Sequence, residues 1–412
     1  MPANALEIDI DRLWRDLEVS GSIGRGKSTG LRRLALSDDD KTMRDAFVRW
    51  CRAAGCAIRV DAFGNIFARR AGVDATLPAV LIGSHLDTQI AGGRYDGILG
   101  VLAGLEVIRT LNDREMVSRR PIEIVSWTNE EGVRFQPPML GSGAFAGIHP
   151  RGWVLTQTGD DGAVFQDELR RIGYQGADSV TPSEYDSYFE LHIEQGPELE
   201  AEGIEVGIVT GGFTSFGAHL QIRGENAHAG PTPMKQRRNA LVGAAIVIAR
   251  LNEIGWRFAP EGRAAVCRID VTPNKYGILP DLAEITIDVR HPQASKAAEM
   301  YKAALDLVPA ASKEGNVDIE VTKEWSFGDI SFDDDLINLV RAVAADLNVT
   351  HKHLRSAAGH DAYHLSRVVP TAMIFTPCKE GITHNEAEHI EPGYTAAGIN
   401  VLMHAVLRRA NA

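Results

Sequence analysis

Cysteine is scarce in this sequence, and the positions of the few cysteines exclude one kind of site. There are four cysteines among 412 residues, and none of them forms a C-x-x-C pair. A structural zinc site built on paired cysteines is therefore not expected. With so few cysteines in a chain of this length, we expect ordinary reduced thiols, which favours a cytoplasmic protein.

Long apolar runs and a surplus of positive charge are also missing. The longest apolar runs, such as residues 77–82, are far too short to span a bilayer. Residues 1–18 alternate acidic with apolar side chains and lack the basic start and apolar core of a signal peptide. The formal net charge of -12 argues against nucleic-acid and membrane partners, because both are polyanionic. A local basic pocket for an anionic small molecule remains compatible with this charge.

What the sequence does contain is the alternation of strands and helices that is typical of an α/β domain. Residues 79–83 form a continuous apolar run of strand length, and a glycine-rich loop follows. A helix is expected over about 98–111 and the next strand over 121–127, which completes a βαβ unit. The pattern resumes near the C-terminus, with expected helices at 334–346 and 395–410 and a strand at 370–376.

The middle of the chain has a different pattern, which predicts a second domain inserted into the first. Its order is β-α-β-β-α-β, the split-βαβ sandwich, and it occupies roughly residues 212–327. The expected strands are 214–224, 264–271, 283–289 and 317–323, and the expected helices are 235–251 and 295–307. A chain of 412 residues is also too long for one typical domain. We therefore expect one domain of residues 1–211 and 328–412, and another of residues 212–327.

Histidine and acidic residues gather where the first strands of the α/β pattern end. His85 stands at the end of a buried strand, where α/β enzymes place their active sites. Asp87, two residues on, could hold the second imidazole nitrogen of His85. Asp96 lies in a glycine-rich loop that could fold back beside His85, and one carboxylate can bridge two cations. Such imidazole and carboxylate ligands together suit zinc, manganese or cobalt.

Three further segments extend this metal-site hypothesis. Glu130 and Glu131 follow a strand pattern, and adjacent residues there point to opposite sides, so one could ligate metal while the other transfers protons. His192 lies within a strand pattern, and His384 lies in a loop after the strand that ends near Phe375. Each residue alone is weak support, since a single histidine at a strand end is more often structural. Their joint occurrence near predicted strand ends favours a metal centre.

One stretch fits the letters of a different site. Residues 21–28, GSIGRGKS, match a phosphate-binding loop of an ATPase or GTPase. That loop needs a buried strand before it and a helix after it, whereas an amphipathic helix is expected here over residues 7–18. We therefore favour a flexible basic loop over an NTPase.

The motifs together resemble the hydantoinase/carbamoylase amidases, within the superfamily of di-zinc aminoacylases and carboxypeptidases. The segments that carry the resemblance are GSHLDTQIAGGRYDGILG, WTNEEGVRF, YFELHIEQGPELE, AHAGPTPM, AAGHDA and GITHNEAEH, in this order from about residue 30 to the C-terminus. The resemblance implies a di-metal, aminopeptidase-like α/β catalytic domain with an inserted α+β lid and dimerisation domain. It also implies a homodimer.

The same resemblance implies a role for each matching residue. His85 and His192 would bind one divalent ion and Glu131 and His384 a second, with Asp96 bridging the two. Glu130 would be the general base and acid, and His228 would stabilise the oxyanion, in the neighbouring subunit's site if the dimer is formed. Gln195, Asn274 and Arg290 would contact the substrate, which is expected to carry a carboxylate. The expected reaction is hydrolysis of an N-carbamoyl-L-amino acid or a related ureido acid to ammonia, carbon dioxide and the amino acid.

The sequence departs from the family pattern at the substrate-contacting positions. Gly277 stands where family members commonly carry a second asparagine, and Phe213 and Phe216 lie in a segment that is more polar in many members. These changes suggest a pocket that is less polar or larger, although Gly277 could also be drift at a position of little consequence. The alternatives therefore include an N-acyl amino acid amidohydrolase or peptidase, an allantoate amidohydrolase, and an aminohydrolase of an aromatic substrate, which Phe213, Phe216 and Tyr276 suggest. A scaffold without activity is not supported, because the expected ligands and Glu130 are all present.

Overall fold

The computed structural model describes residues 6–328 and 330–412, which form two compact units. The first unit runs up to Thr210 and resumes over Ser331–Leu354 and Gly359–Ala412. The second consists of Gly211–Ile330 and Arg355–Ala358. The order of the elements confirms the expected α/β class with an inserted split-βαβ fold.

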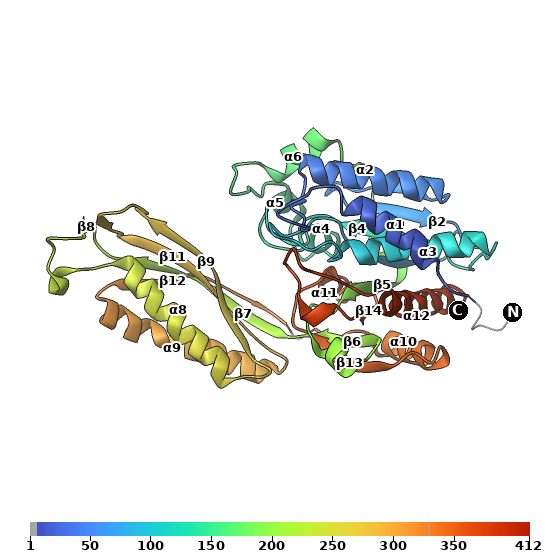
Figure 1. Cartoon of the computed structure of the whole chain (residues 1–412). Helices are drawn as coiled ribbons and strands as arrows, with labels where there is room; N and C mark the ends of the chain where they lie inside the picture. The colour runs from blue at the N-terminus through green and yellow to red at the C-terminus, as the bar shows by residue number, and fades with distance from the viewer. Residues whose placement is uncertain (1–5, 329) are drawn as a thin grey trace. The chain divides into compact units, whose positions relative to one another are not determined.

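A mixed sheet forms the centre of the first unit (Figure 1). Strand β3 runs parallel to β4 and to β5, and β5 runs parallel to β14, so these strands end at one edge. The flanking strands β2 and β6 pair antiparallel with β4 and β14. In sheet order the strands are β1 (Ala57–Val60), β2 (Ile66–Arg70), β4 (Ile122–Trp127), β3 (Ala79–His85), β5 (Tyr185–Ile193), β14 (Thr371–Thr376), β6 (Val206–Gly212) and β13 (His351–Ser356).

Helices flank this sheet, and one of them packs closely against its central strands. Helix α3 (Ile98–Asp113) is buried along most of its length and packs on β3, β4 and β5. Gly100 permits the close approach, since a Cβ there would lie 2.4 Å from the carbonyl oxygen of Leu191. The other helices are α1 (Ile10–Ser20), α2 (Asp38–Ala53), α4 (Leu140–Phe145), α5 (Arg151–Leu155), α6 (Phe165–Ile172), α7 (Glu198–Glu202), α10 (Asp334–Asp346), α11 (Asp361–Leu365) and α12 (Pro392–Ala410), with 3-10 turns η2 (Pro182–Glu184) and η4 (Lys379–Gly381).

The second unit is an antiparallel sheet with two helices side by side on one face (Figure 1). Its strand order is β12, β7, β11, β9, so β12 and β9 are the edges. Apolar side chains that alternate along β7 and β11 pack against helices α8 and α9 to form the core. The elements are β7 (Thr214–Arg223), β8 (Ala227–His228), η3 (Met234–Gln236), α8 (Ala240–Arg257), β9 (Arg263–Thr272), β10 (Ile278–Leu279), β11 (Leu282–His291), α9 (Ala294–Gly315) and β12 (Asp318–Phe327).

Two helices of this unit differ from the sequence prediction at their ends. The helix expected from residue 235 begins at Ala240, because the Asn239 side chain accepts a hydrogen bond from the Leu241 amide at 3.0 Å and caps it there. The helix expected to end at 307 continues to Gly315, past Pro309. Its buried face continues over this extension and includes Ala311, so packing outweighs the local effect of the proline.

Candidate metal centre and active site

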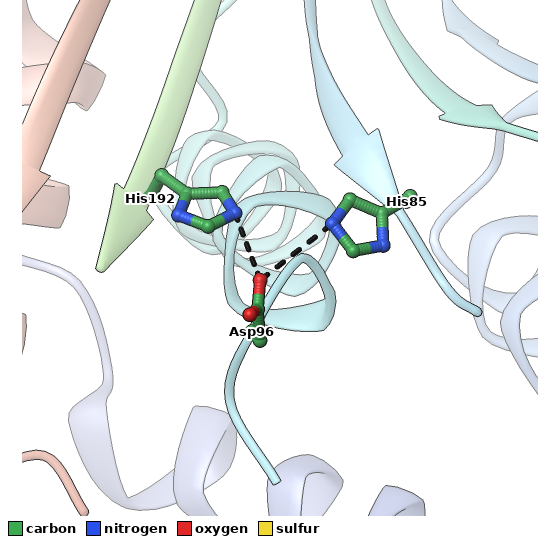
Figure 2. A group of neighbouring side chains, drawn as sticks. All are labelled: His85, Asp96 and His192. Carbon is green, nitrogen blue, oxygen red and sulfur yellow. Dashed lines mark ion pairs between the residues drawn. The ribbon is translucent and has the colours of Figure 1, made fainter. Parts of the chain in front are cut away.

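Three side chains converge at the carboxyl ends of β3 and β5. His85 is the last residue of β3, His192 lies near the end of β5, and Asp96 comes from the loop before α3 (Figure 2). The Asp96 Oδ1 atom lies 3.1 Å from His192 Nε2 and 3.7 Å from His85 Nε2. All three side chains are buried. Their potential ligand atoms lie within 4.8 Å of one another, which is close enough to hold one metal ion.

A second group of potential ligands uses the other oxygen of Asp96. Asp96 Oδ2 lies 3.2 Å from His384 Nε2, and Glu131 Oε2 lies 3.5 Å from the same nitrogen. His384 comes from the loop after β14, and its side chain is 46 % exposed, whereas Glu131 and Asp96 are buried. The atoms of this group also lie within 4.8 Å of one another. Asp96 therefore directs one oxygen toward each group, as a bridging carboxylate does.

Glu130 borders the first group without belonging to either. Its Oε2 atom lies 3.5 Å from His85 Nε2, while the neighbouring Glu131 faces His384. Burial, together with the nearby Asp361 and Glu131 carboxylates, raises the pKa of Glu130 well above its usual value. A buried carboxylate with such a pKa beside potential metal ligands has the properties expected of a general base and acid.

Asp87 supports the site, but differently from the sequence-based expectation. Its carboxylate was expected to hold His85, yet Asp87 Oδ1 is 3.9 Å from His85 Nδ1. The backbone carbonyl of Asp87 accepts the His85 Nδ1–H bond instead, at 2.9 Å. The carboxylate accepts from the amides of Glu130 and Glu131, at 3.2 Å each. The tight turn after β3 places the carbonyl closer, which frees the carboxylate to hold the Glu130–Glu131 backbone.

The histidine ring orientations and the charge balance both fit divalent cations. His192 Nδ1 lies 2.9 Å from the carbonyl oxygen of Ile193, as His85 Nδ1 does from that of Asp87, so both rings turn Nε2 toward Asp96. Among the described residues, His192 Nε2 is a buried nitrogen without a hydrogen bond of good geometry, although Asp96 is near. Burial raises the pKa of Glu131 to about 7. This crowding of buried carboxylates is what divalent cations offset.

A third cluster, formed by Glu190, His192 and His360, also has closely spaced ligand atoms. Its carboxylate, however, is already hydrogen-bonded to neighbouring groups of the protein. The Glu190 carboxylate accepts hydrogen bonds from the Ser84 hydroxyl at 2.9 Å, the Tyr188 hydroxyl at 3.0 Å and the Ala362 amide at 3.0 Å. With its oxygens engaged in this way, Glu190 is a poor candidate ligand. It fixes the strand end from which His192 projects.

The two groups of potential metal ligands are together called the ligand cluster, which consists of His85, Asp96, Glu131, His192 and His384. Gln195, which was expected to contact substrate, lies in the first unit beside this cluster. Its Nε2 donates to Asp96 Oδ2 at 2.9 Å, and its Oε1 is buried without a hydrogen-bond partner in the described chain. The backbone there has a φ of +58°, which turns the side chain back toward Asp96 after β5 ends. Gln195 therefore presents an unused acceptor beside the potential bridging carboxylate.

The other residues expected to meet the substrate lie in the second unit. His228 is exposed and pairs with Ile278 in the short β8–β10 ladder. Asn274 and Gly277 belong to the loop before β10, and Gly277 has a φ of +92° with open space around its missing Cβ. Arg290, near the end of β11, donates through Nε to Asp288 at 2.7 Å. These four residues thus lie on a different unit from the ligand cluster.

Two of the aromatic residues that suggested an aromatic substrate, Phe216 and Tyr276, lie in the second unit. Phe216 stacks on Tyr301 with 5.3 Å between ring centroids and packs against the core. Tyr276 is fully exposed. Neither position favours an aromatic substrate.

The glycine-rich stretch at residues 21–28 does not form a phosphate loop. Helix α1 precedes it, and residues 21–37, all of which the structure describes, contain no helix. The residues that directly follow the stretch pack on the loops that carry Asp96 and His384, because Leu31 and Gly92 exchange backbone hydrogen bonds at 2.9 Å. Thr29 donates to the Glu386 carbonyl at 2.5 Å. The rejection of an NTPase agrees with this geometry.

Sequence reasoning missed two polar residues that touch the ligand cluster. Gln89 donates through Nε2 to Glu131 Oε2 at 2.7 Å. Glu388 is buried and accepts from the amides of Tyr95 and Asp96. Both lie inside the segments GSHLDTQ and GITHNEAEH that also carry His85 and His384, so proximity to the ligands was the available signal.

The chain is similar to known enzymes over almost its whole length. The chain is 39% identical over 409 residues to an N-carbamoyl-L-amino-acid amidohydrolase from Rhizobium meliloti, covering 99% of this chain and 98% of that protein. It is 30% identical to a ureidoglycolate hydrolase from Arabidopsis thaliana, covering 97% and 86% of the two chains. The crystal structure of a hydantoinase/carbamoylase family amidase from Burkholderia vietnamiensis matches with a TM-score of 0.94 and 44% identity, covering 99% of both chains.

The fold and these relatives define the class of the protein, a hydrolase that acts on C–N bonds. Residues 81–408 match the model of peptidase family M20/M25/M40, and the chain belongs to this family. The resemblance to hydantoinase/carbamoylase amidases inferred from the sequence motifs is confirmed. Among the residues that the structure describes, no helix is long and apolar enough to cross a membrane.

Proposed function

We propose that this protein is a metal-dependent amidohydrolase that cleaves the C–N bond of an N-carbamoyl-L-amino acid or a related ureido acid. The observation that carries the proposal is the pair of ligand groups that share Asp96, with Glu130 beside them. The similarity to N-carbamoyl-L-amino-acid amidohydrolases supports the substrate class. His85, Asp96 and His192 would hold one divalent ion, and Asp96, Glu131 and His384 the other, with zinc, manganese and cobalt all compatible with these donors.

The chemistry follows from the positions of the acids. When bound, two divalent ions polarise the scissile carbonyl and acidify the attacking water. Glu130 would accept the proton of that water and deliver it to the leaving nitrogen of the amino acid. The C–N bond breaks as carbamate is released, and carbamate then decomposes to ammonia and carbon dioxide. Gln195 Oε1, the buried free acceptor, is suited to receive a hydrogen bond from the carbamoyl NH2 group.

The second unit would complete the site as a lid. His228 would donate a hydrogen bond to the developing oxyanion, a contact worth roughly 3 kcal/mol in other hydrolases. Arg290 would bind the substrate carboxylate, and Asn274 its neighbouring polar atoms. Because Arg290 already donates to Asp288, the substrate carboxylate would share or replace that bond. Gly277 would leave room beside His228 for a larger or less polar substrate group.

We further propose a homodimer formed through strand β9 and helix α8. Strand β9 is an edge of its sheet, and Ile269 on it is 44% exposed. The adjoining helix α8 exposes Leu241, Val242 and Trp256. An unpaired strand edge beside exposed apolar side chains favours pairing with a second copy. Such a dimer could bring His228 to the neighbouring site.

The four free cysteines are compatible with a cytoplasmic location.

Among these related ureido acids, allantoate and ureidoglycolate are the second candidate substrates after the N-carbamoyl-L-amino acids. They are favoured by the similarity to the ureidoglycolate hydrolase of Arabidopsis thaliana over most of both chains. N-acyl amino acid hydrolysis, peptidase activity and aromatic amine hydrolysis are further alternatives, which the substrate panel below distinguishes.

The test is metal removal followed by a substrate panel. Protein treated with a chelator is restored separately with zinc, manganese or cobalt, and release of ammonia and of free amine is followed. The panel holds N-carbamoyl-L-amino acids, N-carbamoyl-β-alanine, allantoate, ureidoglycolate, N-acetyl amino acids, dipeptides and aromatic amines. Metal-dependent turnover of a carbamoyl amino acid is expected. Preference for an acyl or aromatic compound would contradict the proposed substrate, and failure to bind metal would contradict the proposed centre.

A further inference from the structure

Glu388 is a buried carboxylate that joins two loops of the ligand cluster. Its Oε1 atom accepts hydrogen bonds from the backbone amides of Tyr95 at 2.8 Å and Asp96 at 3.1 Å. Its Oε2 atom accepts from the Thr383 hydroxyl at 3.1 Å. Only 4% of Glu388 is exposed, so these bonds are made away from competing water. The loop that carries Asp96 is thereby bonded to the loop that carries His384.

Thr383 extends this connection to the Asp96 side chain. Its hydroxyl lies 3.2 Å from Asp96 Oδ2, the oxygen that faces His384. The Gln195 amide donates to the same Oδ2 at 2.9 Å. Glu388 therefore holds the backbone of Asp96 directly and, through Thr383, is connected to the Asp96 oxygen that faces His384 in the second ligand group.

The arrangement at Glu388 resembles the one found at Asp87. There, one buried carboxylate accepts from the consecutive amides of Glu130 and Glu131. Here, Glu388 accepts from the consecutive amides of Tyr95 and Asp96. In both places an acid that is no ligand itself fixes a short backbone segment from which a potential ligand projects.

The Glu388 carboxylate occupies the space that a side chain at Gly93 would need. A Cβ at this position would lie 1.9 Å from the Glu388 carboxyl carbon and 2.0 and 2.1 Å from its oxygens. No side chain can occupy this space while Glu388 keeps its place. The requirement for glycine in the GGRYD segment thus has a physical cause at Gly93, namely the carboxylate of a residue almost 300 positions later.

We infer that Glu388 is a positioning residue for the metal centre, which sets the direction of Asp96 and couples it to the His384 loop. This inference rests on the proposed function, since it assumes that Asp96 bridges two bound ions. Without Glu388, two buried amides lose their acceptor and the Asp96 loop is free to move, so both ions should bind more weakly. Residues that hold metal ligands in this way typically contribute 10- to 100-fold in metal affinity.

The test compares metal affinity in Glu388→Ala, Glu388→Gln and wild type, using competition with a chromophoric chelator and the cobalt absorption spectrum. Glu388→Ala should weaken metal binding by about 10- to 100-fold and alter the cobalt spectrum. Glu388→Gln should retain most of the affinity, because its carbonyl oxygen can accept from both amides while its NH2 group donates to Thr383. The control is Glu386→Ala in the same loop, whose partly exposed side chain pairs with Lys27 at 3.5 Å, and it should behave like wild type.

A double-mutant cycle separates positioning from a general loss of stability. The single substitution Gly93→Ala should weaken metal binding, because the added methyl group displaces Glu388. In Gly93→Ala/Glu388→Ala the space is vacated, so the added methyl group should cause little further loss. The thermal midpoint of each metal-free variant shows whether the protein is folded. Wild-type affinity and an unchanged cobalt spectrum in a folded Glu388→Ala would overturn the inference, and so would independent, additive losses in the cycle. Absence of metal binding by wild type would instead refute the proposed function.

Discussion

At the scale of single residues, two adjacent acids face different partners. Glu130 Oε2 lies 3.5 Å from His85 Nε2, whereas Glu131 Oε2 lies 3.5 Å from His384 Nε2 and accepts from Gln89. Both backbone amides donate to the Asp87 carboxylate, which holds the backbone segment from which the two side chains diverge. This divergence is the structural basis for assigning proton transfer to one acid and metal binding to the other.

Substitution of each of the two adjacent acids by glutamine provides a matched pair of variants that tests this assignment. Glu130→Gln should lower kcat by at least about 100-fold while metal content stays at the wild-type level, because the amide cannot accept a proton. Glu131→Gln should instead lose metal from the second site, since an amide is a weaker ligand than a carboxylate. Metal analysis of the purified proteins alongside kcat distinguishes the two. Loss of metal in Glu130→Gln, or full activity in it, would contradict the assignment.

Gly97 is the residue at which backbone conformation and the site interact most directly. It has a φ of +68°, and a Cβ there would lie 2.3 to 2.4 Å from atoms of the His85 ring. Gly97→Ala should therefore displace His85 and reduce metal affinity and turnover together. Gly147→Ala is the control, because Gly147 has a φ of +72° but no atom within 4 Å of a Cβ. It should cost about 1–2 kcal/mol of stability and leave metal binding intact. Equal effects of the two substitutions on metal affinity would contradict this account.

At the scale of elements, the long elements with periodic apolar residues could be predicted from the sequence, and several short elements could not. The βαβ pattern of β3, α3 and β4 and the split-βαβ order of the second unit follow from long periodic runs of apolar residues. Helices α4 and α5 have six and five residues, too few to show a helical period. Strands β6 and β13 also went unpredicted. The sheet order β4-β3-β5-β14 depends on contacts between strands far apart in sequence, which no local pattern contains.

The edge strand β9 carries a prediction that belongs to this scale. If β9 and α8 form the dimer interface, Ile269→Lys should place an unpaired charge in it and shift the protein toward monomer. The control is Thr322→Lys on β12, the opposite edge of the same sheet, which should remain dimeric. Light scattering after size-exclusion chromatography measures the mass. A monomeric wild type, or an Ile269→Lys variant that stays dimeric, would contradict the proposed interface.

At the scale of the whole molecule, the potential ligands belong to one unit and the proposed substrate contacts largely to the other. His85, Asp96, Glu131, His192 and His384 all lie in the first unit, and His228, Asn274, Gly277 and Arg290 in the second. Metal binding and substrate recognition should therefore be separable. A variant in the second unit can weaken substrate binding without changing metal affinity.

Hydrogen exchange with and without metal tests this separation. Metal at 100 times its dissociation constant should stabilise the unit that binds it by about 2.7 kcal/mol. Added protection is expected at the ends of β3 and β5 and in the loop before α3, while β7 and β11 should exchange as before. Calcium, which prefers all-oxygen sites, serves as the control ion. Protection confined to β7 and β11 would contradict the location of the centre.

The sequence by itself determined the kind of chemistry. Histidine and acidic residues placed after predicted strands, in recurring segments such as GSHLDTQ and GITHNEAEH, identified the ligand candidates and the family. Periodic apolar runs determined the α/β class and the inserted unit. These features are local, because residue type and hydrophobic periodicity are properties of short stretches of sequence.

Only the tertiary structure decided how those residues work together. It showed which oxygen of Asp96 faces each histidine, that the Asp87 carbonyl rather than its carboxylate bonds to His85, and that Glu388 holds the Asp96 loop. The Glu388–Asp96 hydrogen bond joins residues 292 positions apart. Such contacts arise when buried amides and carboxylates must satisfy one another inside the folded chain, and local sequence carries no record of that pairing.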